Sequence, residues 1–171
     1  MAEERQLEVW MRGPISGVPA LLQPVAHALL QVKEEVAVYM EDFDNRYLWQ
    51  RPGGRAAVGF HLQHMDGVIE RMFTYANNQA LSEAQFARLR AEGMEMPEIS
   101  GAGLVIALQE RVDWAIGQLK QTDENQLTHP RYLGRKRIPT TLIGLLFHAA
   151  EHTQRHLGQL FVTLKLLPLL T

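Results

Sequence analysis

The 171-residue chain contains no cysteine. This absence excludes disulfide bonds, thiolate metal sites and a cysteine nucleophile, and it leaves histidine, aspartate and glutamate as the possible metal ligands. The chain also lacks a strong charge of either sign, because 17 basic and 19 acidic residues give a formal net charge of −2. A nucleic-acid partner requires a basic surface, so we expect no direct nucleic-acid binding.

Long hydrophobic runs are missing as well. No apolar stretch reaches the roughly 18 uncharged residues that a membrane span requires. The N-terminal residues, MAEERQLEVWMRG, are charged and do not contain the apolar run of a signal peptide. We therefore expect no membrane span, and we expect a cytoplasmic location.

The remaining composition is that of one globular domain, which we predict over residues 1–171, with 1–18 as an irregular N-terminal lead-in. Apolar residues recur at helical spacing in four long segments, and a shorter helix is predicted over 82–93, where Ser82 and Gln85 form a capping-box pattern. There is hardly any strand pattern. The expected fold class is all-α, a four-helix bundle in which the longer connections leave room for a crossover connection. The long helices are predicted at about 19–42, 55–77, 101–122 and 140–167.

Three of the seven histidines lie four residues apart on the last predicted helix: His148, His152 and His156. Side chains at this spacing share one side of a helix, and two imidazoles at i and i+4 can bind one metal ion. At about 100° per residue, His156 lies about 40° from the centre of the apolar face, His152 about 80° and His148 about 120°. The pair His152 and His156 is therefore favoured as ligands.

Two histidines leave a metal site short of ligands, because a catalytic zinc usually has three protein ligands and an open position. The second long helix offers His61 and His64. The helical wheel places His61 nearer the apolar centre and His64 at the polar edge, so the wheel alone favours His61. A metal-free seam of hydrogen-bonded histidines is the competing interpretation.

One further motif competes for the same residues. The run from His148 to His152 matches H-x-x-E-H, the inverted zinc-protease signature, with Glu151 as its general base. That chemistry needs a downstream acidic ligand, and residues 153–171 contain no Asp or Glu. Glu151 falls on the polar face, where an i,i+4 pair with Arg155 is the simpler interpretation. We therefore reject the protease.

The chain resembles the DinB-like (YfiT-like) family of metal-dependent four-helix-bundle proteins. The resemblance is carried by VGFHLQHMDGVIERMFTYA on the second long helix and by LLFHAAEHTQRHLGQL on the last one. In the family, H-x-x-x-H on a late helix is closely followed by Gly-Gln, as with Gly158 and Gln159 here. An earlier helix supplies a third histidine ahead of a basic or aromatic position, a pattern that His64 with Arg71 matches best.

The resemblance implies three metal ligands, His64, His152 and His156, and a divalent ion such as zinc or nickel. It thus selects His64 where the wheel favoured His61. His61 and His148 are then expected to line the site or to support the ligands. The family's usual arginine after the last ligand is Leu157 here, so no anion-binding role carries over to that position.

By resemblance, the expected function is metal-dependent hydrolysis, or thiol-dependent transfer with a low-molecular-weight thiol, on a small-molecule substrate. The alternative is a non-catalytic bundle that binds a metal or a ligand. We expect a homodimer, with the apolar tail 160–170 either at the interface or packed within the bundle. The basic stretch 131–137 is either a solvated loop or a site for an anionic group. No sequence motif identifies the substrate or a catalytic base.

Overall fold

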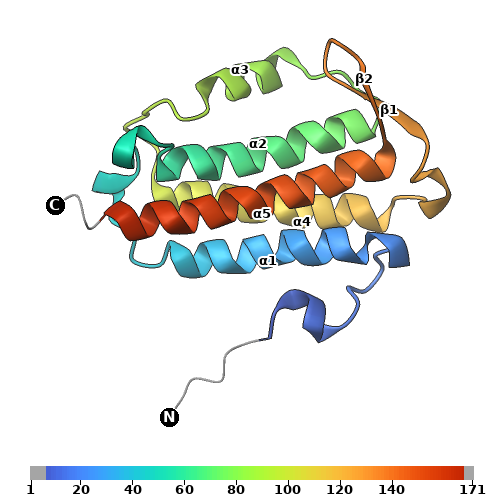
Figure 1. Ribbon diagram of the computed structural model, residues 1–171, viewed down its shortest axis with the longest axis horizontal. Helices are drawn as coiled ribbons and strands as arrows, with labels where there is room; N and C mark the ends of the chain where they lie inside the picture. Colours follow the sequence, from blue (N-terminus) through green and yellow to red (C-terminus); the bar gives the residue numbers. More distant parts are fainter. Residues whose placement is uncertain (1–6, 168–171) are drawn as a thin grey trace.

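The computed structural model describes residues 7–167. Within this range the chain forms five α-helices, several short 3-10 turns and one β-hairpin (Figure 1). The helices are α1 (Gln23–Tyr39), α2 (Val58–Ala76), α3 (Glu83–Ala91), α4 (Gly101–Lys120) and α5 (Leu142–Leu166), and the strands are β1 (Pro130–Leu133) and β2 (Ile138–Thr141).

Four of the helices, α1, α2, α4 and α5, form the bundle. Both α1 and α2 pack against α4 and α5, so α1 and α2 occupy opposite corners. Helices α1 and α5 run in one direction and α2 and α4 in the other, and the segment containing α3 returns the chain from the end of α2 to the start of α4 (Figure 1). The expected four-helix bundle with a crossover connection is confirmed.

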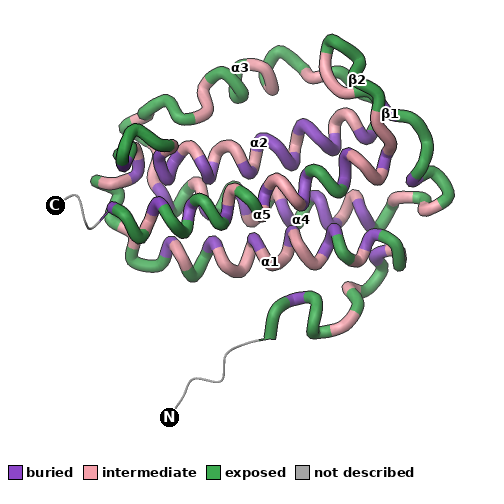
Figure 2. The backbone as a smooth tube through the Cα atoms, in the orientation of Figure 1, coloured by how far each residue is buried: buried purple, intermediate pink, exposed green. Residues whose placement is uncertain are grey.

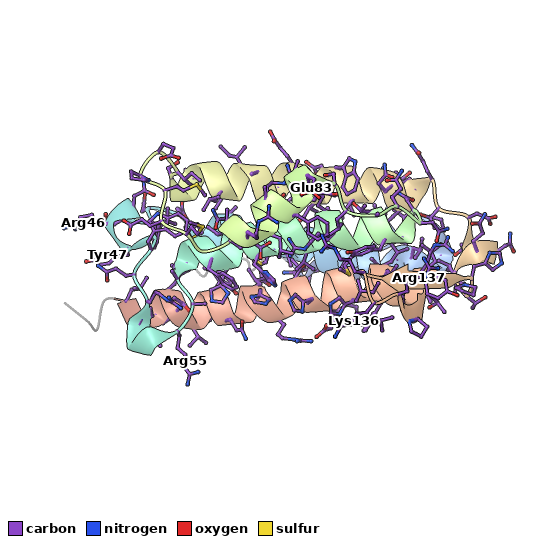
Figure 3. All side chains as sticks on the ribbon, turned by 90° about the horizontal axis from the view of Figure 1, so that it is seen from above. Arg46, Tyr47, Arg55, Glu83, Lys136 and Arg137 are labelled. Carbon is purple, nitrogen blue, oxygen red and sulfur yellow. The ribbon has the colours of Figure 1, made fainter. Side chains whose placement is uncertain are left out.

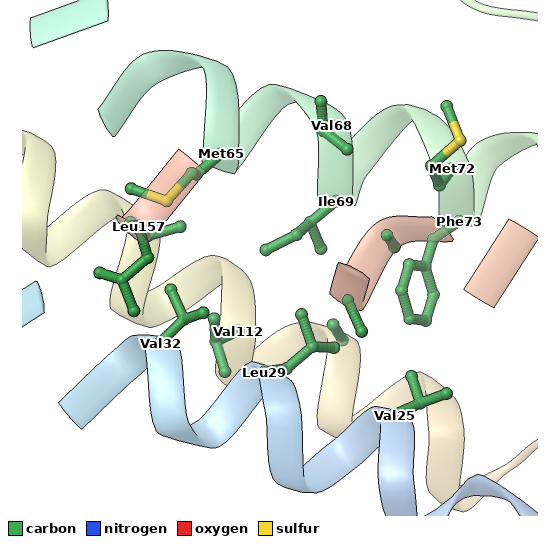
Figure 4. Close-up of a cluster of buried hydrophobic side chains, with 14 of the residues drawn as sticks. Val25, Leu29, Val32, Met65, Val68, Ile69, Met72, Phe73, Val112 and Leu157 are labelled. Atoms are coloured by element: carbon green, nitrogen blue, oxygen red, sulfur yellow. The ribbon is translucent and has the colours of Figure 1, made fainter. Parts of the chain in front are cut away.

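The core lies between the four bundle helices. Figure 4 shows Val32 of α1, Met65 and Ile69 of α2, Val112 of α4 and Leu157 of α5 converging from all four corners. These side chains are buried, because apolar residues spaced three and four apart form one continuous face on each helix. In contrast, α3 and the hairpin lie on the outside and are largely exposed (Figure 2).

The helix ends follow local capping chemistry. Ser82 and Gln85 form a reciprocal capping box at the start of α3, as the sequence predicts. The hydroxyl of Thr141 accepts from the amide of Gly144 and caps α5. The observed helices are a few residues shorter than predicted. A 3-10 turn at Ala20–Leu22 precedes α1, and Thr140 pairs in β2 instead of opening α5.

The hairpin corrects the interpretation of the basic stretch 131–137 as a simple loop. Strands β1 and β2 pair antiparallel, with Leu133 opposite Ile138, and Gly134 and Arg137 take positive φ angles at the turn. The strands are too short to give a readable alternation, and proline, present here as Pro130 and Pro139, is atypical of strands. Buried Arg131 donates from Nε to the carbonyl of Ala76 at 2.6 Å, which ties the hairpin to the C-terminal end of α2.

The predicted lead-in lies along α1. The described part forms a 3-10 turn at Val9–Arg12, where Arg12 makes an ion pair with Glu34 at 2.7 Å. Residues 1–6 of the lead-in and 168–171 of the apolar tail lie outside the described residues. Over residues 7–167, no helix combines the length and apolarity needed to cross a bilayer.

Candidate metal centre

A cluster of histidines occupies the seam where α2 and α5 run side by side. His64 comes from α2, and His152 and His156 come from α5. One nitrogen from each of these rings lies within 4.8 Å of the others. The structure thus brings together the three residues predicted as ligands, while their binding of a metal stays a prediction.

Exposure along α5 follows the helical wheel. His152 and His156 are partly buried at the seam, whereas the side chain of His148 is 46% exposed. On α2, His61 is only 3% exposed and His64 is intermediate, again as the wheel places them. His64 nevertheless reaches the cluster, because the segment after α3 covers the polar edge of α2. Position on the wheel therefore gave burial correctly, but it did not indicate which of the two histidines joins the three-histidine cluster.

A carboxylate from outside the bundle holds His64. Glu92, the residue directly after α3, places Oε2 at 2.6 Å from Nδ1 of His64. The Glu92 side chain is only 7% exposed. An anionic acceptor at this distance keeps the hydrogen on Nδ1 and leaves Nε2 with its lone pair, the arrangement in which histidine binds a metal. The ring of Phe60 stacks against His64 with 5.2 Å between centroids.

The other oxygen of Glu92 is bound to Arg71. Nη1 of Arg71 donates to Oε1 of Glu92 at 2.5 Å, and the arginine side chain is 8% exposed. Gly67 provides the space for this pair, because a Cβ at that position would lie 2.5 Å from Oε1 of Glu92 and closer still to the guanidinium. The buried carboxylate thus has a partner for each oxygen, as a buried charge requires.

His61 of α2 contacts a predicted ligand on α5 in a similar way. Its Nδ1 lies 3.0 Å from Nδ1 of His156, so one of these nitrogens donates to the other. Because this contact involves Nδ1 of His156, the other ring nitrogen, Nε2, is not part of it. His61 therefore contacts a predicted ligand, in keeping with the expectation that it lines the site or supports the ligands.

Burial lowers the pKa of three histidines at the seam, His61, His152 and His156. Desolvation is the largest cause that lowers the pKa of His156, to about 3, and that of His61, to about 4. The pKa of His152 is lowered as well, again mainly by desolvation, with a smaller contribution from the nearby His64. A metal ion binds the neutral imidazole, so at neutral pH no proton has to leave these rings first.

The donor set fits a divalent ion. Nε2 of His64 lies 3.0 Å from Nε2 of His152, whereas two nitrogens bound to one tetrahedral zinc are about 3.3 Å apart. Among the buried side-chain nitrogens and oxygens of residues 7–167, Nδ1 of His152 is the one without a hydrogen-bond partner. Buried polar atoms normally have a partner, so the ring of His152 is the least satisfied member of the cluster.

A second group, His148, Glu151 and His152, also has ligand atoms within 4.8 Å. Its carboxylate is already bound, because Nε of Arg155 donates to Glu151 at 3.0 Å, and this hydrogen bond is the main cause of the lowered pKa of Glu151. The predicted pair of Glu151 with Arg155 is thus present, and a carboxylate held by an arginine is a poor general base.

A cavity of about 520 Å³ opens next to the cluster, between the C-terminal half of α5 and the segment before α2. His61 forms part of its wall, together with Gln159 and Arg155. Arg55, in the segment before α2, is another of its lining residues (Figure 3). The volume is within the range of small-molecule sites.

Sequence reasoning missed Glu92. The residue follows a short exposed helix, and no periodicity or motif distinguishes it from the other acidic residues of the chain. Leu157, the residue directly after His156, is buried in the core. A histidine cluster between two helices of a crossover bundle defines the class: a helical-bundle protein with a candidate metal centre.

The chain belongs to the DinB superfamily, whose family model matches residues 21–160. Among solved structures it is similar to YfiT from Bacillus subtilis, described as "a probable metal-dependent hydrolase with an unusual four-helix bundle topology". The TM-score is 0.56 at 16% identity, and the match covers 86% of this chain and 90% of that one, which establishes a shared fold. No curated protein matches the chain.

Proposed function

We propose that the protein is a metal-dependent enzyme that acts on a small molecule through His64, His152 and His156. The observation that carries this proposal is the convergence of three imidazoles, one nitrogen of each lying within 4.8 Å of the others. Membership of the DinB superfamily and the description of YfiT as a metal-dependent hydrolase support it.

The ion is divalent, with zinc or nickel as the candidates, since an all-imidazole donor set suits both. A divalent ion in a three-histidine site supplies Lewis-acid activation of water for hydrolysis, or of a thiol for transfer. The chain's own residues would orient and shield the site. Glu92 fixes the tautomer of His64, His61 contacts His156, and the ring of Phe60 covers His64 on one face.

The substrate would enter through the 520 Å³ cavity, because His61 connects its wall to His156. Glu151 is excluded as the general base by its pairing with Arg155. Proton transfer during the reaction would therefore involve the activated water or thiol itself and neutral imidazoles such as that of His61. In this account hydrolysis is the first candidate reaction, because YfiT is described as a hydrolase.

Metal analysis of protein purified without added metal, and again after zinc or nickel loading, tests the site. The account predicts one ion per chain in the wild type and in His148→Ala, and none in His152→Ala or His156→Ala. The control is matched, since His148 lies on the same helix and is largely outside the cluster. Stoichiometric metal in the His152→Ala, His156→Ala double variant would refute the assignment.

The reaction class is tested separately with metal-loaded protein. A panel of esters, amides and phosphate esters measures hydrolysis, and a panel of electrophiles with a low-molecular-weight thiol measures transfer. Activity in the first panel that disappears in His152→Ala supports hydrolysis. Activity only when the thiol is present supports the transferase. Metal binding without activity in either panel favours the alternative, a non-catalytic metal-binding module.

We also propose a homodimer formed through the exposed part of the C-terminal helix. Of the apolar tail, Leu160 and Leu167 belong to the core, whereas Val162 and Leu166 are 56% and 42% exposed and also line the 520 Å³ cavity. Packing within the bundle thus accounts for part of the tail, and the exposed side chains beside the cavity are the ones left for the proposed interface. Sedimentation velocity tests the dimer: Val162→Arg is expected to shift a wild-type dimer towards the monomer, and a monomeric wild type contradicts the proposal.

A further inference from the structure

A second hollow lies at the other end of the bundle. Its volume is about 580 Å³, and it opens between the C-terminal end of α2, the start of α3 and the β-hairpin. Figure 3 shows Arg137 of the hairpin and Arg55, which lines the first cavity, towards opposite ends of the bundle. Tyr75 in its wall is about 16 Å along α2 from His64. The two cavities are therefore separate sites.

Aromatic rings and two arginines form the wall. The guanidinium of Arg135 lies over the ring of Phe86 at 4.8 Å, and that of Arg137 lies over the ring of Tyr132 at 4.3 Å. Tyr75 and Leu81 complete the apolar part of the wall. A guanidinium stacked on a ring is held in place while its in-plane N–H groups stay free to bind an anion.

The positive charges of the two arginines in the hollow are not neutralised by acidic residues in its lining. None of its lining residues is acidic, and within residues 7–167 neither Arg135 nor Arg137 makes an ion pair. The amide side chains of Asn78 and Gln79 add neutral hydrogen-bonding groups. Two fixed positive groups without a counter-charge attract an anion.

The two arginines are also not needed to cap α2. An arginine near a helix C-terminus often binds the last carbonyls, but this role is already filled. Arg131 donates to the carbonyl of Ala76. Three backbone N–H groups occupy the preceding carbonyls: Asn77 donates to Phe73, Gln79 to Thr74 and Asn78 to Tyr75. Among residues 7–167, the guanidinium groups of Arg135 and Arg137 therefore have no structural partner beyond the aromatic rings on which they lie.

We propose that this hollow binds a small organic anion, in which a phosphate or carboxylate group attached to a planar ring is held by Arg135 and Arg137. The anionic group pairs with the free edges of the two guanidinium groups. The ring lies against the aromatic and apolar wall formed by Tyr75, Tyr132 and Leu81. The site is independent of the metal centre and of the reaction proposed there.

Phenyl phosphate tests this assignment in a titration of the ¹⁵N-labelled full chain followed by amide chemical shifts. The expected result is saturable movement of the amides of Asn78, Gln79 and Gly134, while Gly158 beside the first cavity is unchanged. Inorganic phosphate and phenol, which each carry one half of the probe, are expected to bind at least tenfold more weakly. Sodium chloride is expected to weaken the binding.

The double variant Arg135→Gln, Arg137→Gln is expected to weaken phenyl phosphate binding by tenfold or more. Lys136→Gln is the matched control, since Lys136 lies between the two arginines in the chain but is not in the wall. It is expected to bind like the wild type. The spectrum of each free variant reports whether the hairpin is intact, and the salt dependence of the wild type tests the charge without any substitution.

Three results would overturn the proposal. The first is the absence of saturable shifts at the hollow, or shifts confined to residues near the metal centre. The second is a double variant with an intact hairpin and wild-type affinity. The third is equal binding of inorganic phosphate or of phenol, which would remove the ring or the charge from the recognition. None of these results bears on the metal content of the protein.

Discussion

Nδ1 of His64 is 2.6 Å from a carboxylate oxygen of Glu92, which lies 28 residues later in the chain and outside the bundle. The crossover segment thus has a function beyond connecting α2 to α4. It places the buried carboxylate of Glu92 against His64, the one proposed ligand that comes from α2. Because Arg71 binds the second oxygen of the same carboxylate, the imidazole is oriented by a side chain that is itself fixed.

Removing this carboxylate is expected to weaken metal binding. Partners that hold a ligand histidine typically contribute 10- to 100-fold in affinity. We predict a loss of this size for zinc in Glu92→Ala and a smaller loss in Glu92→Gln, whose amide oxygen still accepts from Nδ1 of His64. Competition with a chelating dye gives the dissociation constants. The control is Glu70→Gln, whose carboxylate pairs with Arg88 and Arg111 and is expected to bind zinc like the wild type. Equal affinity in Glu92→Ala and wild type would mean that the contact is only structural.

Gly67 is expected to be intolerant of a side chain. In Gly67→Ala the new Cβ would overlap the Arg71–Glu92 pair, at 2.5 Å from Oε1 of Glu92. Overpacking of this kind costs about 1–3 kcal/mol in the free energy of unfolding, and we expect weaker zinc binding as well. Gly117 on α4 is the matched control, since nothing lies within 4 Å of its Cβ position. There, alanine is expected to stabilise the helix by about 0.5–1 kcal/mol. Urea denaturation compares the two variants, and similar values for both would contradict this account of Gly67.

The metal-free protein is expected to lose stability in mild acid. The pKa of His61 is about 4 and that of His156 about 3 in the folded chain, below the value near 6.5 in the unfolded chain. Between these limits the unfolded chain binds protons that the folded chain does not, so the free energy of unfolding falls as the pH is lowered from about 6.5 towards 4. Each group contributes a slope of at most about 1.4 kcal/mol per pH unit.

Urea denaturation of chelator-treated protein between pH 5 and pH 7 measures this slope. His61→Gln is expected to flatten it, because the group that resists protonation is gone. His148→Gln is expected to keep the wild-type slope, since its side chain is nearly half exposed and lies at the margin of the cluster. If both variants run parallel to the wild type, His61 does not contribute to the pH dependence.

The helices and the histidine pair could be predicted from the sequence, because both depend on local spacing. The apolar positions gave α2 and α5 to within a few residues, and the wheel ranked His148 as the most exposed of its row. Sequence position could not decide between His61 and His64. Both histidines face the seam, and they differ in their partners. His61 contacts His156, whereas His64 contacts Glu92 and His152.

The role of Glu92 and the hairpin could not be predicted from the sequence, because both depend on contacts between distant parts of the chain. Glu92 carries no local signal, and its role comes from the return of the crossover segment over α2. The strands around Gly134 are only four residues long, and buried Arg131, which the sequence grouped with a basic cluster, anchors them to α2. Charge alone did not separate this structural arginine from the exposed Arg135 and Arg137.

Anomalous diffraction from crystals of the metal-loaded protein, recorded on both sides of the zinc and nickel absorption edges, tests the three-histidine assignment. We predict one anomalous peak per chain at the seam of α2 and α5, bound by His64, His152 and His156, with Glu92 still in contact with Nδ1 of His64. A peak bound by His148 and Glu151 instead, or no peak at the seam in metal-loaded crystals, would contradict it.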